Sequence, residues 1–275
     1  MKKNLIISFS LTALLFATII SCNKSSSAPA AGQQNLTMFL TDAPGDYQHV
    51  YVDIRSVFVK IEKEKESGND SGGDNSNEEW VNLNANAKVY DLLALNNGID
   101  ALLANSNTPL GQIKEIKLEL GTNNSIVING ITFPLQLDAS EAEVEIECNN
   151  DNFEEDGNSQ FRIWLDFDVS SSVLELPGNI FWLRPVINMF NQKASGEIEG
   201  KINPASGVAS IKIYNANHTY FGTPEEEGEF KIRGIAPGTY TIEITGKNGY
   251  RNETITNITV KAGEDTKIEN IQLIL

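Results

Sequence analysis

The sequence is short of the side chains on which most metal and redox chemistry depends. Its 275 residues include two cysteines and two histidines. Two cysteines cannot hold a disulfide-rich scaffold together or build a cysteine-based zinc cluster, and two histidines leave little for a multi-histidine metal site. The sequence therefore predicts no metal, no cofactor and no disulfide framework.

Positive charge is also scarce, because 21 Lys and Arg residues face 37 Asp and Glu residues for a formal net charge of −16. Binding to nucleic acid depends on neutralising phosphates, so we exclude nucleic acid as a partner of so acidic a chain. The length allows one large domain or two modest ones, each able to bury a core.

A long apolar run occurs at the start of the chain. Lys2 and Lys3 precede residues 5–20, an apolar stretch interrupted only by Ser and Thr. This is the length of a signal-peptide core and shorter than most spanning helices. The run ends in Ile19-Ile20-Ser21-Cys22, which resembles the lipobox of bacterial lipoproteins. The resemblance implies that Cys22 is lipidated and becomes the first mature residue, and an ordinary secretory signal is the alternative.

A lipid on Cys22 predicts a membrane partner, because each buried CH₂ of an acyl chain contributes about 0.8 kcal/mol. We predict a lipoprotein signal peptide over residues 1–21 and a flexible tether of Ser, Ala and Gly over residues 22–33. The predicted location is the bacterial cell envelope, specifically the outer membrane, with the facing left open. Residues 1–21 contain two lysines and no acidic residue, so their removal changes the net charge from −16 to −18.

The rest of the chain follows the two-residue period of β-strands. A first domain is predicted over residues 34–193, with one helical candidate at residues 92–103 that Asn96-Asn97-Gly98 interrupts. Its predicted strands are residues 36–40, 50–61, 80–83, 112–120, 125–133, 141–148, 160–167 and 179–190. The pattern predicts a mainly β fold of two β-sandwich domains in tandem, the first larger and carrying one or two short helices.

A smaller second domain is predicted over residues 194–275, where turn residues separate short alternating strands. The acidic charge is uneven between the two domains. Residues 34–193 hold 10 basic and 26 acidic side chains, whereas residues 194–275 hold 8 and 11. The excess of acid therefore belongs to the first domain.

The first domain resembles a prokaryotic family known as domain of unknown function 4382. The resemblance is carried by Leu40-Thr41-Asp42-Ala43-Pro44, by Tyr90-Asp91-Leu92-Leu93-Ala94-Leu95, by Leu165-Asp166-Phe167-Asp168-Val169 and by Leu183-Arg184-Pro185-Val186-Ile187. It implies an exported, often lipid-anchored protein and implies no activity.

The second domain resembles the carboxypeptidase regulatory-like domain, a transthyretin-like sandwich also grouped with carbohydrate-binding-like folds. Gly228-Glu229-Phe230-Lys231-Ile232 and the run from Gly234 to Tyr240 carry the resemblance, together with Gly249-Tyr250. The resemblance implies a spacer or docking platform, and the fold alone implies no ligand.

The candidate ligand face lies on the strand predicted at residues 160–167. Alternation places Arg162, Trp164, Asp166 and Asp168 on one face and Ile163, Leu165 and Phe167 on the other. A tryptophan beside hydrogen-bonding groups suits a glycan, whereas the alternative is an Arg–Asp pair with Trp164 packed at a sheet edge. The two aspartates do not flank a bond as a glycosidase pair would, and Asp168 can instead cap a short helical turn.

Other acidic or reactive residues favour structural roles. Residues 42–46 predict a turn, with a calcium loop as the alternative, and residues 67–79 and 149–157 predict solvated acidic loops. Cys148 is predicted to pack in a strand, since its surroundings are too acidic to activate a nucleophile. His49 and His218 are predicted at the surface or in turns.

We therefore predict a non-catalytic, membrane-tethered envelope protein that binds or presents something, with a polysaccharide as one ligand. The alternative is a structural or assembly component with an envelope protein as partner. A hydrolase is the third and least supported hypothesis.

Overall fold

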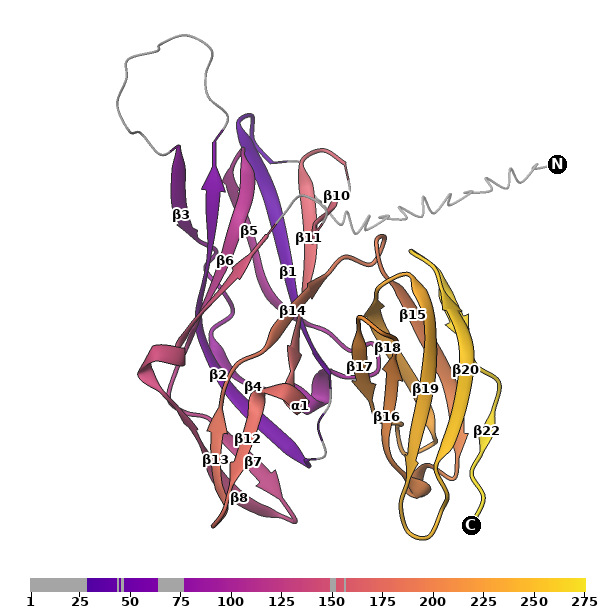
Figure 1. Cartoon of the computed structure of the whole chain (residues 1–275). Coiled ribbons are helices and arrows are strands. Elements are labelled where there is room, and N and C mark those ends of the chain that lie inside the picture. The colour runs from indigo at the N-terminus through magenta and orange to yellow at the C-terminus, as the bar shows by residue number, and fades with distance from the viewer. Residues whose placement is uncertain (1–28, 44, 46, 64–76, 149–151, 156) are drawn as a thin grey trace, which may run out of the picture.

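The computed structural model describes residues 29–43, 45, 47–63, 77–148, 152–155 and 157–275, and it confirms the mainly β prediction. Two modules lie side by side (Figure 1), and each has its own buried apolar cluster, drawn from residues 36–183 and 198–273. The described part of the chain contains no helix that is long and apolar enough to cross a bilayer. The predicted signal peptide and Cys22 lie outside the described residues.

The first module is a sandwich of a five-stranded and a nine-stranded sheet. The five-stranded sheet has the order β10-β11-β1-β5, with β14 also paired to β11. The nine-stranded sheet has the order β12-β13-β8-β7-β2-β6-β9, with β3 and β4 also paired to β2. The strands are β1 (Gln33–Ala43), β2 (His49–Glu62), β3 (Glu78–Asn82), β4 (Lys88–Asp91), β5 (Ala101–Pro109), β6 (Gln112–Leu120), β7 (Ser125–Ile128), β8 (Ile131–Leu137), β9 (Glu143–Glu147), β10 (Glu154–Glu155), β11 (Gln160–Asp168), β12 (Val173–Leu176), β13 (Ile180–Leu183) and β14 (Ile187–Phe190).

The long strand β2 organises the nine-stranded sheet. Its buried residues alternate through Val50, Val52 and Ile54 and then resume at Val57, one residue out of phase. The register with β6 shifts at the same point, between Ile54 and Ser56. Such a bulge adds one residue and increases the twist, so both halves of the strand face the same core.

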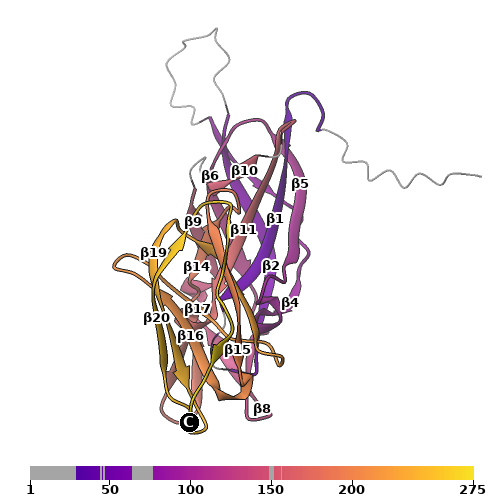
Figure 2. The same ribbon diagram turned by 90° about the vertical axis from the view of Figure 1, so that its right-hand side faces the viewer.

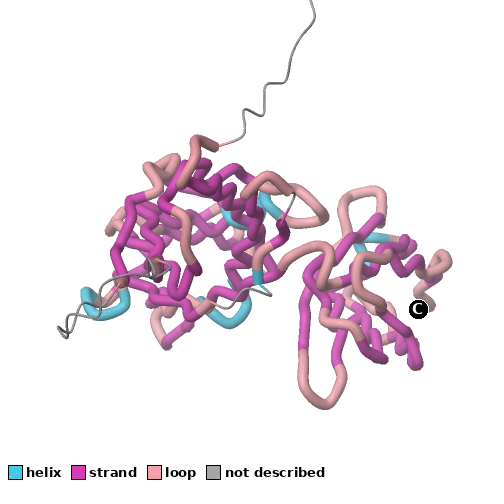
Figure 3. Tube along the Cα trace, turned by 90° about the horizontal axis from the view of Figure 1, so that it is seen from above, coloured by secondary structure: helices cyan, strands magenta, loops and turns pink. Residues whose placement is uncertain are grey.

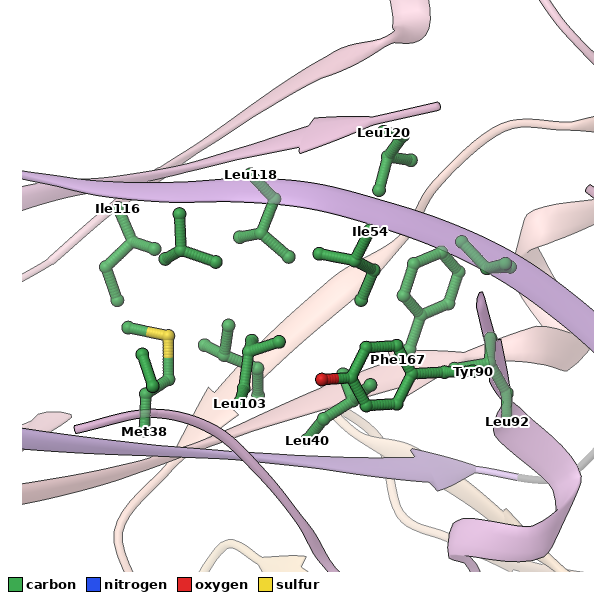
Figure 4. Packing of buried hydrophobic residues seen from close by; sticks show 14 of the residues in the cluster. Met38, Leu40, Ile54, Tyr90, Leu92, Leu103, Ile116, Leu118, Leu120 and Phe167 are labelled. Atoms are coloured by element: carbon green, nitrogen blue, oxygen red, sulfur yellow. The ribbon is translucent and has the colours of Figure 1, made fainter. Parts of the chain in front are cut away.

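The core of the first module forms where the two sheets face each other (Figure 4). Met38, Leu40 and Phe167 from the five-stranded sheet meet Ile54, Ile116 and Leu118 from the nine-stranded sheet, and all six are fully buried. Burying one such side chain contributes about 1.5–3 kcal/mol, which makes this contact the main support of the module.

The helix predicted at residues 92–103 is wrong. A single 3₁₀ turn, η1 (Leu92–Leu95), ends before the extended residue Asn96, and β5 begins at Ala101. Between them Asn97 and Gly98 have φ angles of 51° and 87°, a left-handed pair that reverses the chain. The leucines at residues 92–103 therefore lie partly in one 3₁₀ turn and partly in the first residues of β5.

Two predicted strands are each divided into a pair. Residues 125–133 form β7 and the start of β8, joined at Asn129-Gly130, which has the positive φ angles of a tight hairpin turn. Residues 179–190 form β13 in one sheet and β14 in the other. A period of two cannot show where a chain leaves one sheet for the next.

The second module consists of two four-stranded sheets with the orders β18-β15-β21, where β22 also pairs β15, and β17-β16-β19-β20. Ile198, Ile213, Phe230 and Tyr240 are among its buried residues. The strands are β15 (Gly196–Asn203), β16 (Val208–Tyr214), β17 (Thr219–Gly222), β18 (Glu229–Ile235), β19 (Gly238–Gly246), β20 (Glu253–Val260), β21 (Asp265–Lys267) and β22 (Ile271–Gln272).

The second module covers the outer face of the five-stranded sheet. β17 lies against β1, and β17 and β18 are the strands of the second module nearest the first (Figure 1). A view turned by 90° places the second module in front of β11 and β14 (Figure 2), and the view from above separates the two bodies clearly (Figure 3).

Candidate functional site

The residues predicted as a ligand face do lie on the outer side of β11. Ile163, Leu165 and Phe167 point into the core, whereas Trp164 belongs to the opposite face and is not part of that cluster. β11 is an inner strand, since it pairs with β1 on one side and with β10 and β14 on the other. The alternative of a sheet-edge position for Trp164 is therefore wrong.

Trp164 is a buried part of the contact between the modules. Only 3% of the residue is exposed, and its ring stacks between Phe39 and Phe190 at centroid distances of 5.1 and 6.0 Å. Register explains this row, because Phe39 and Phe190 are the cross-strand neighbours of Trp164 in β1 and β14. The ring therefore has no free face on which a sugar could stack.

Asp100 joins the aromatic row to the second module. Its carboxylate accepts a hydrogen bond from Trp164 Nε1 at 3.0 Å and is paired with the guanidinium of Arg233, whose Nη1 lies 3.1 Å from Oδ2. The two side chains are 21% and 10% exposed, so the pair is shielded from water. A shielded, hydrogen-bonded pair of this kind is costly to break.

β18 approaches the first module closely at two further points. The backbone N–H of Lys231 donates to Asn97 Oδ1 at 3.1 Å. A Cβ atom on Gly234 would lie 2.7 Å from the Phe190 ring, and the glycine has a φ angle of +72°. The short Cβ distance and the positive φ angle both require glycine at position 234. This close approach and the Lys231–Asn97 hydrogen bond hold β18 against the outer face.

A cleft of about 500 Å³ remains open beside this contact. Asp166, Asp168 and Asn188 line it from the first module, and His218, Tyr220 and Phe221 line it from the second. Asn188 is the cross-strand neighbour of Asp166, so the polar wall is the row next to the buried aromatic row. The volume lies within the range of small-molecule sites.

The aromatic wall of the cleft is held in place by its own hydrogen bonds. The His218 and Tyr220 rings stack at 6.2 Å with an interplanar angle of 25°. The Tyr220 hydroxyl accepts a hydrogen bond from the N–H of Ala236 at 3.0 Å. Asn215 Oδ1 accepts from the N–H groups of Asn217 and His218 at 2.8 Å each, which fixes the β16–β17 turn.

The two remaining members of the predicted face have structural partners. Arg162 pairs with the buried Glu154 at 2.6 Å and lies 5.9 Å above the Trp164 ring. Asp168 accepts the N–H of Ser171 at 2.9 Å and caps the helix α1 (Val169–Ser172), as the capping alternative predicts. Of the predicted face, Asp166 and Asp168 line the cleft, whereas Arg162 does not.

Asp42 stands apart as a buried carboxylate. Its oxygens are buried and have no side-chain hydrogen-bond partner among the described residues, and it lines a cavity of about 30 Å³ with Asp166 and Arg233. Burial, followed by the nearby charge of Asp166, raises the pKa of Asp42 well above its ordinary value. Pro44 and Asp46 of the predicted turn lie outside the described residues.

The other candidate groups are placed as follows. Glu154 of the acidic 149–157 segment pairs with Arg162 and Lys193, while residues 149–151 and 156, like most of the 67–79 loop, lie outside the described residues. His49 is hydrogen-bonded to Asp91 at 2.7 Å. Within the described ranges no group of three or more His, Cys, Asp or Glu side chains could hold a metal ion.

The sequence did not identify the aromatic wall. His218 was predicted at the surface or in a turn, and no strand was predicted at β17. The available signal was the alternation of His218 and Tyr220, which places two rings on one side of a short strand. Four residues are too few for that signal to stand out.

The model of a domain of unknown function, DUF4382, matches residues 33–185. A search among curated proteins finds no match for the chain. Among solved structures, the chain is similar to a type II cohesin–X-dockerin complex from Acetivibrio cellulolyticus, at 25% identity over 28% of this chain and 56% of that one, with a TM-score of 0.24. The match therefore spans little more than half the length of the cohesin–X-dockerin chain.

Two pilins are matched over more of their length. They are the minor pilin GBS52 of Streptococcus agalactiae, at 9% identity over 88% of this chain and 97% of that one, and the shaft pilin SpaA of Lactobacillus rhamnosus GG, at 11% identity over 88% and 98%. The TM-scores are 0.23 and 0.27. Scores this low do not establish a common fold.

Proposed function

The chain belongs to the DUF4382 family, whose name assigns no activity, and from the geometry of its cleft we propose that it is a non-catalytic, lipid-anchored envelope protein that binds a polysaccharide between its two modules. The observation that carries this proposal is that one module lines the cleft with aromatic rings and the other lines it with polar side chains. Two stacked rings, His218 and Tyr220, lie on one side of the cleft, and Asp166, Asp168 and Asn188 lie on the other.

Such a pair of walls suits the two kinds of surface that a sugar ring presents. The C–H face of the sugar is apolar and packs on an aromatic ring, while its hydroxyls donate to carboxylate and amide oxygens. A charged acceptor makes the stronger hydrogen bond, which favours a site with two aspartates. Because the walls come from different modules, the contact at Asp100 and Arg233 sets their separation.

Retention on immobilised polysaccharides tests the cleft. The full-length protein in detergent should be retained by at least one of dextran, cellulose, mannan, xylan or alginate. His218→Ala should weaken retention about tenfold, equivalent to about 1.4 kcal/mol. Trp80→Ala is the matched control, because Trp80 is an exposed aromatic residue of the distant strand β3. Equal retention of both variants would contradict the proposal.

The anchor is proposed from Cys22 and the apolar run before it. Metabolic labelling with an alkyne fatty acid should mark the wild type and Cys148→Ala but not Cys22→Ala. Cys148 is the matched control because it is the other cysteine of the chain. Fractionation of labelled cells should place the protein in the outer membrane, and protease shaving of intact cells then decides its facing.

An assembly role is the second candidate, and a specific apolar surface favours it. Leu174, Leu176 and Ile180 are 36%, 38% and 41% exposed on β12 and β13, at the border of the nine-stranded sheet. Register places Leu174 opposite Trp182 and Leu176 opposite Ile180, so these side chains share one face. Cross-linking in membranes should then yield a protein partner for the wild type and not for Leu176→Asp.

A further inference from the structure

We infer that the ligand of the cleft is a polysaccharide without acidic groups, a step that rests on the proposed function and names its class of substrate. The described residues that line the cleft include no lysine and no arginine. Their polar groups are carboxylates, amides and hydroxyls, together with the ring of His218. The cleft therefore offers many hydrogen bonds and no fixed positive charge.

Three cationic side chains on segments around the cleft have carboxylate partners of their own. Arg162 and Lys193 pair with Glu154, and Arg233 pairs with Asp100. A uronic acid, sulfate or phosphate group in the cleft would therefore meet Asp166 and Asp168 without a counter-charge. Removing such a group from water without a partner is strongly unfavourable.

The carboxylates of the cleft also determine which ligand groups can form hydrogen bonds there. An ionised carboxylate is an acceptor only, with two oxygens that can take hydrogen bonds from adjacent hydroxyls. Asp168 already accepts bonds from Ser170 and from both the N–H and the hydroxyl of Ser171, which disperses its charge.

Polysaccharide gels in neutral, acidic and cationic forms test the inference. Affinity electrophoresis of the full-length protein in detergent would compare neutral gels (dextran, hydroxyethylcellulose, mannan) with acidic gels (carboxymethyl-dextran, carboxymethylcellulose, alginate) and a cationic gel (diethylaminoethyl-dextran). We expect retardation in at least one neutral gel, unchanged when salt rises from 0.05 to 0.5 M, since uncharged ligands are not screened. His218→Ala should reduce this retardation about tenfold.

Two variants separate the site from the fold. Asn188→Ala removes an exposed acceptor from the polar wall and should weaken neutral retention severalfold, whereas Asn188→Arg adds the missing cation and should create retention in the carboxymethyl gel of the same backbone. Retention confined to acidic gels overturns the inference and leaves a glycan cleft in place. Retention in none of the gels overturns the proposed function and the inference with it.

Discussion

The two faces of the five-stranded sheet are made by alternate residues of the same strands, and they differ in what covers them. The inner face, with Met38, Leu40 and Phe167, is apolar and is closed by the nine-stranded sheet. The outer face carries an aromatic row around Trp164 and a polar row around Asp166, and the second module covers the first row while leaving the second beside a cleft. An aromatic residue on a polar strand face can therefore form the contact between two modules rather than a binding platform.

Phe167→Ala should have the largest effect, because it empties the centre of the inner face. Truncating a fully buried phenylalanine costs about 3–5 kcal/mol, through lost burial and the cavity left behind. Urea unfolding followed by tryptophan fluorescence measures this loss. Trp80→Ala, at an exposed site, should cost less than about 1 kcal/mol, and equal costs for the two variants would contradict the assigned core.

Asp100→Ala should rank second, because it leaves the Arg233 guanidinium and Trp164 Nε1 without their shared acceptor. Breaking such a shielded pair costs about 3 kcal/mol. The loss should appear as faster proteolysis between the modules, with the core of the first module still folded.

A double-mutant cycle with Arg233→Ala sharpens this test. We expect a coupling energy of about 1–3 kcal/mol between Asp100 and Arg233. The control pair, Lys201 and Glu229, is separated by 3.5 Å at an exposed site, and its coupling should be near zero. Additive effects at Asp100 and Arg233 would rule out the joint.

Asp42→Asn should change the pH dependence of stability. Since the folded-state pKa of Asp42 is raised, the native state binds its proton more tightly than the unfolded state, and the stability from this group is lost as pH rises through that pKa. The variant has no charge to bury, so its Tm should fall less than that of the wild type between pH 4 and pH 8. Glu226→Gln, which removes an exposed charge, should follow the wild type.

The smallest expected effect concerns Cys148, whose thiol should react more slowly than an ordinary thiol in the native protein. Burial raises the pKa of its thiol to about 12, and the sulfur lies 3.6 Å from Met189 Sδ. At pH 8 it should form about a thousandfold less thiolate than an ordinary thiol. Ellman's reagent should therefore modify it slowly in the native protein and promptly in urea, and rapid native modification would contradict its packing.

Much of the fold could be predicted because strand alternation is a local property of the backbone. The strands at residues 112–120 and 160–167 follow from it, as does the division of β11 into two faces. The helix at residues 92–103 failed because leucine spacing fits a helix, a turn or a strand equally well over so few residues. The strand at residues 179–190 failed because its two halves join different sheets.

Only one side of the candidate site could be predicted from the sequence. Asp166 and Asp168 were identified from the alternation of β11, but the opposing His218 and Tyr220 lie about fifty residues further along the chain. No pattern in either segment indicates that the two meet. Their proximity depends on the packing of the second module on the first, where Asp100 and Arg233 make contact across 133 residues of sequence.

Composition and a period of two account for the β-class, the excess of acid in the first domain and the residues that share each strand face. The covered Trp164, the pairing of Arg162 with Glu154 and the cleft beside them depend on tertiary packing. These two groups of features differ in the range of the interactions that produce them. Alternation is set between neighbouring residues, whereas burial of an outer face depends on which distant surface packs against it.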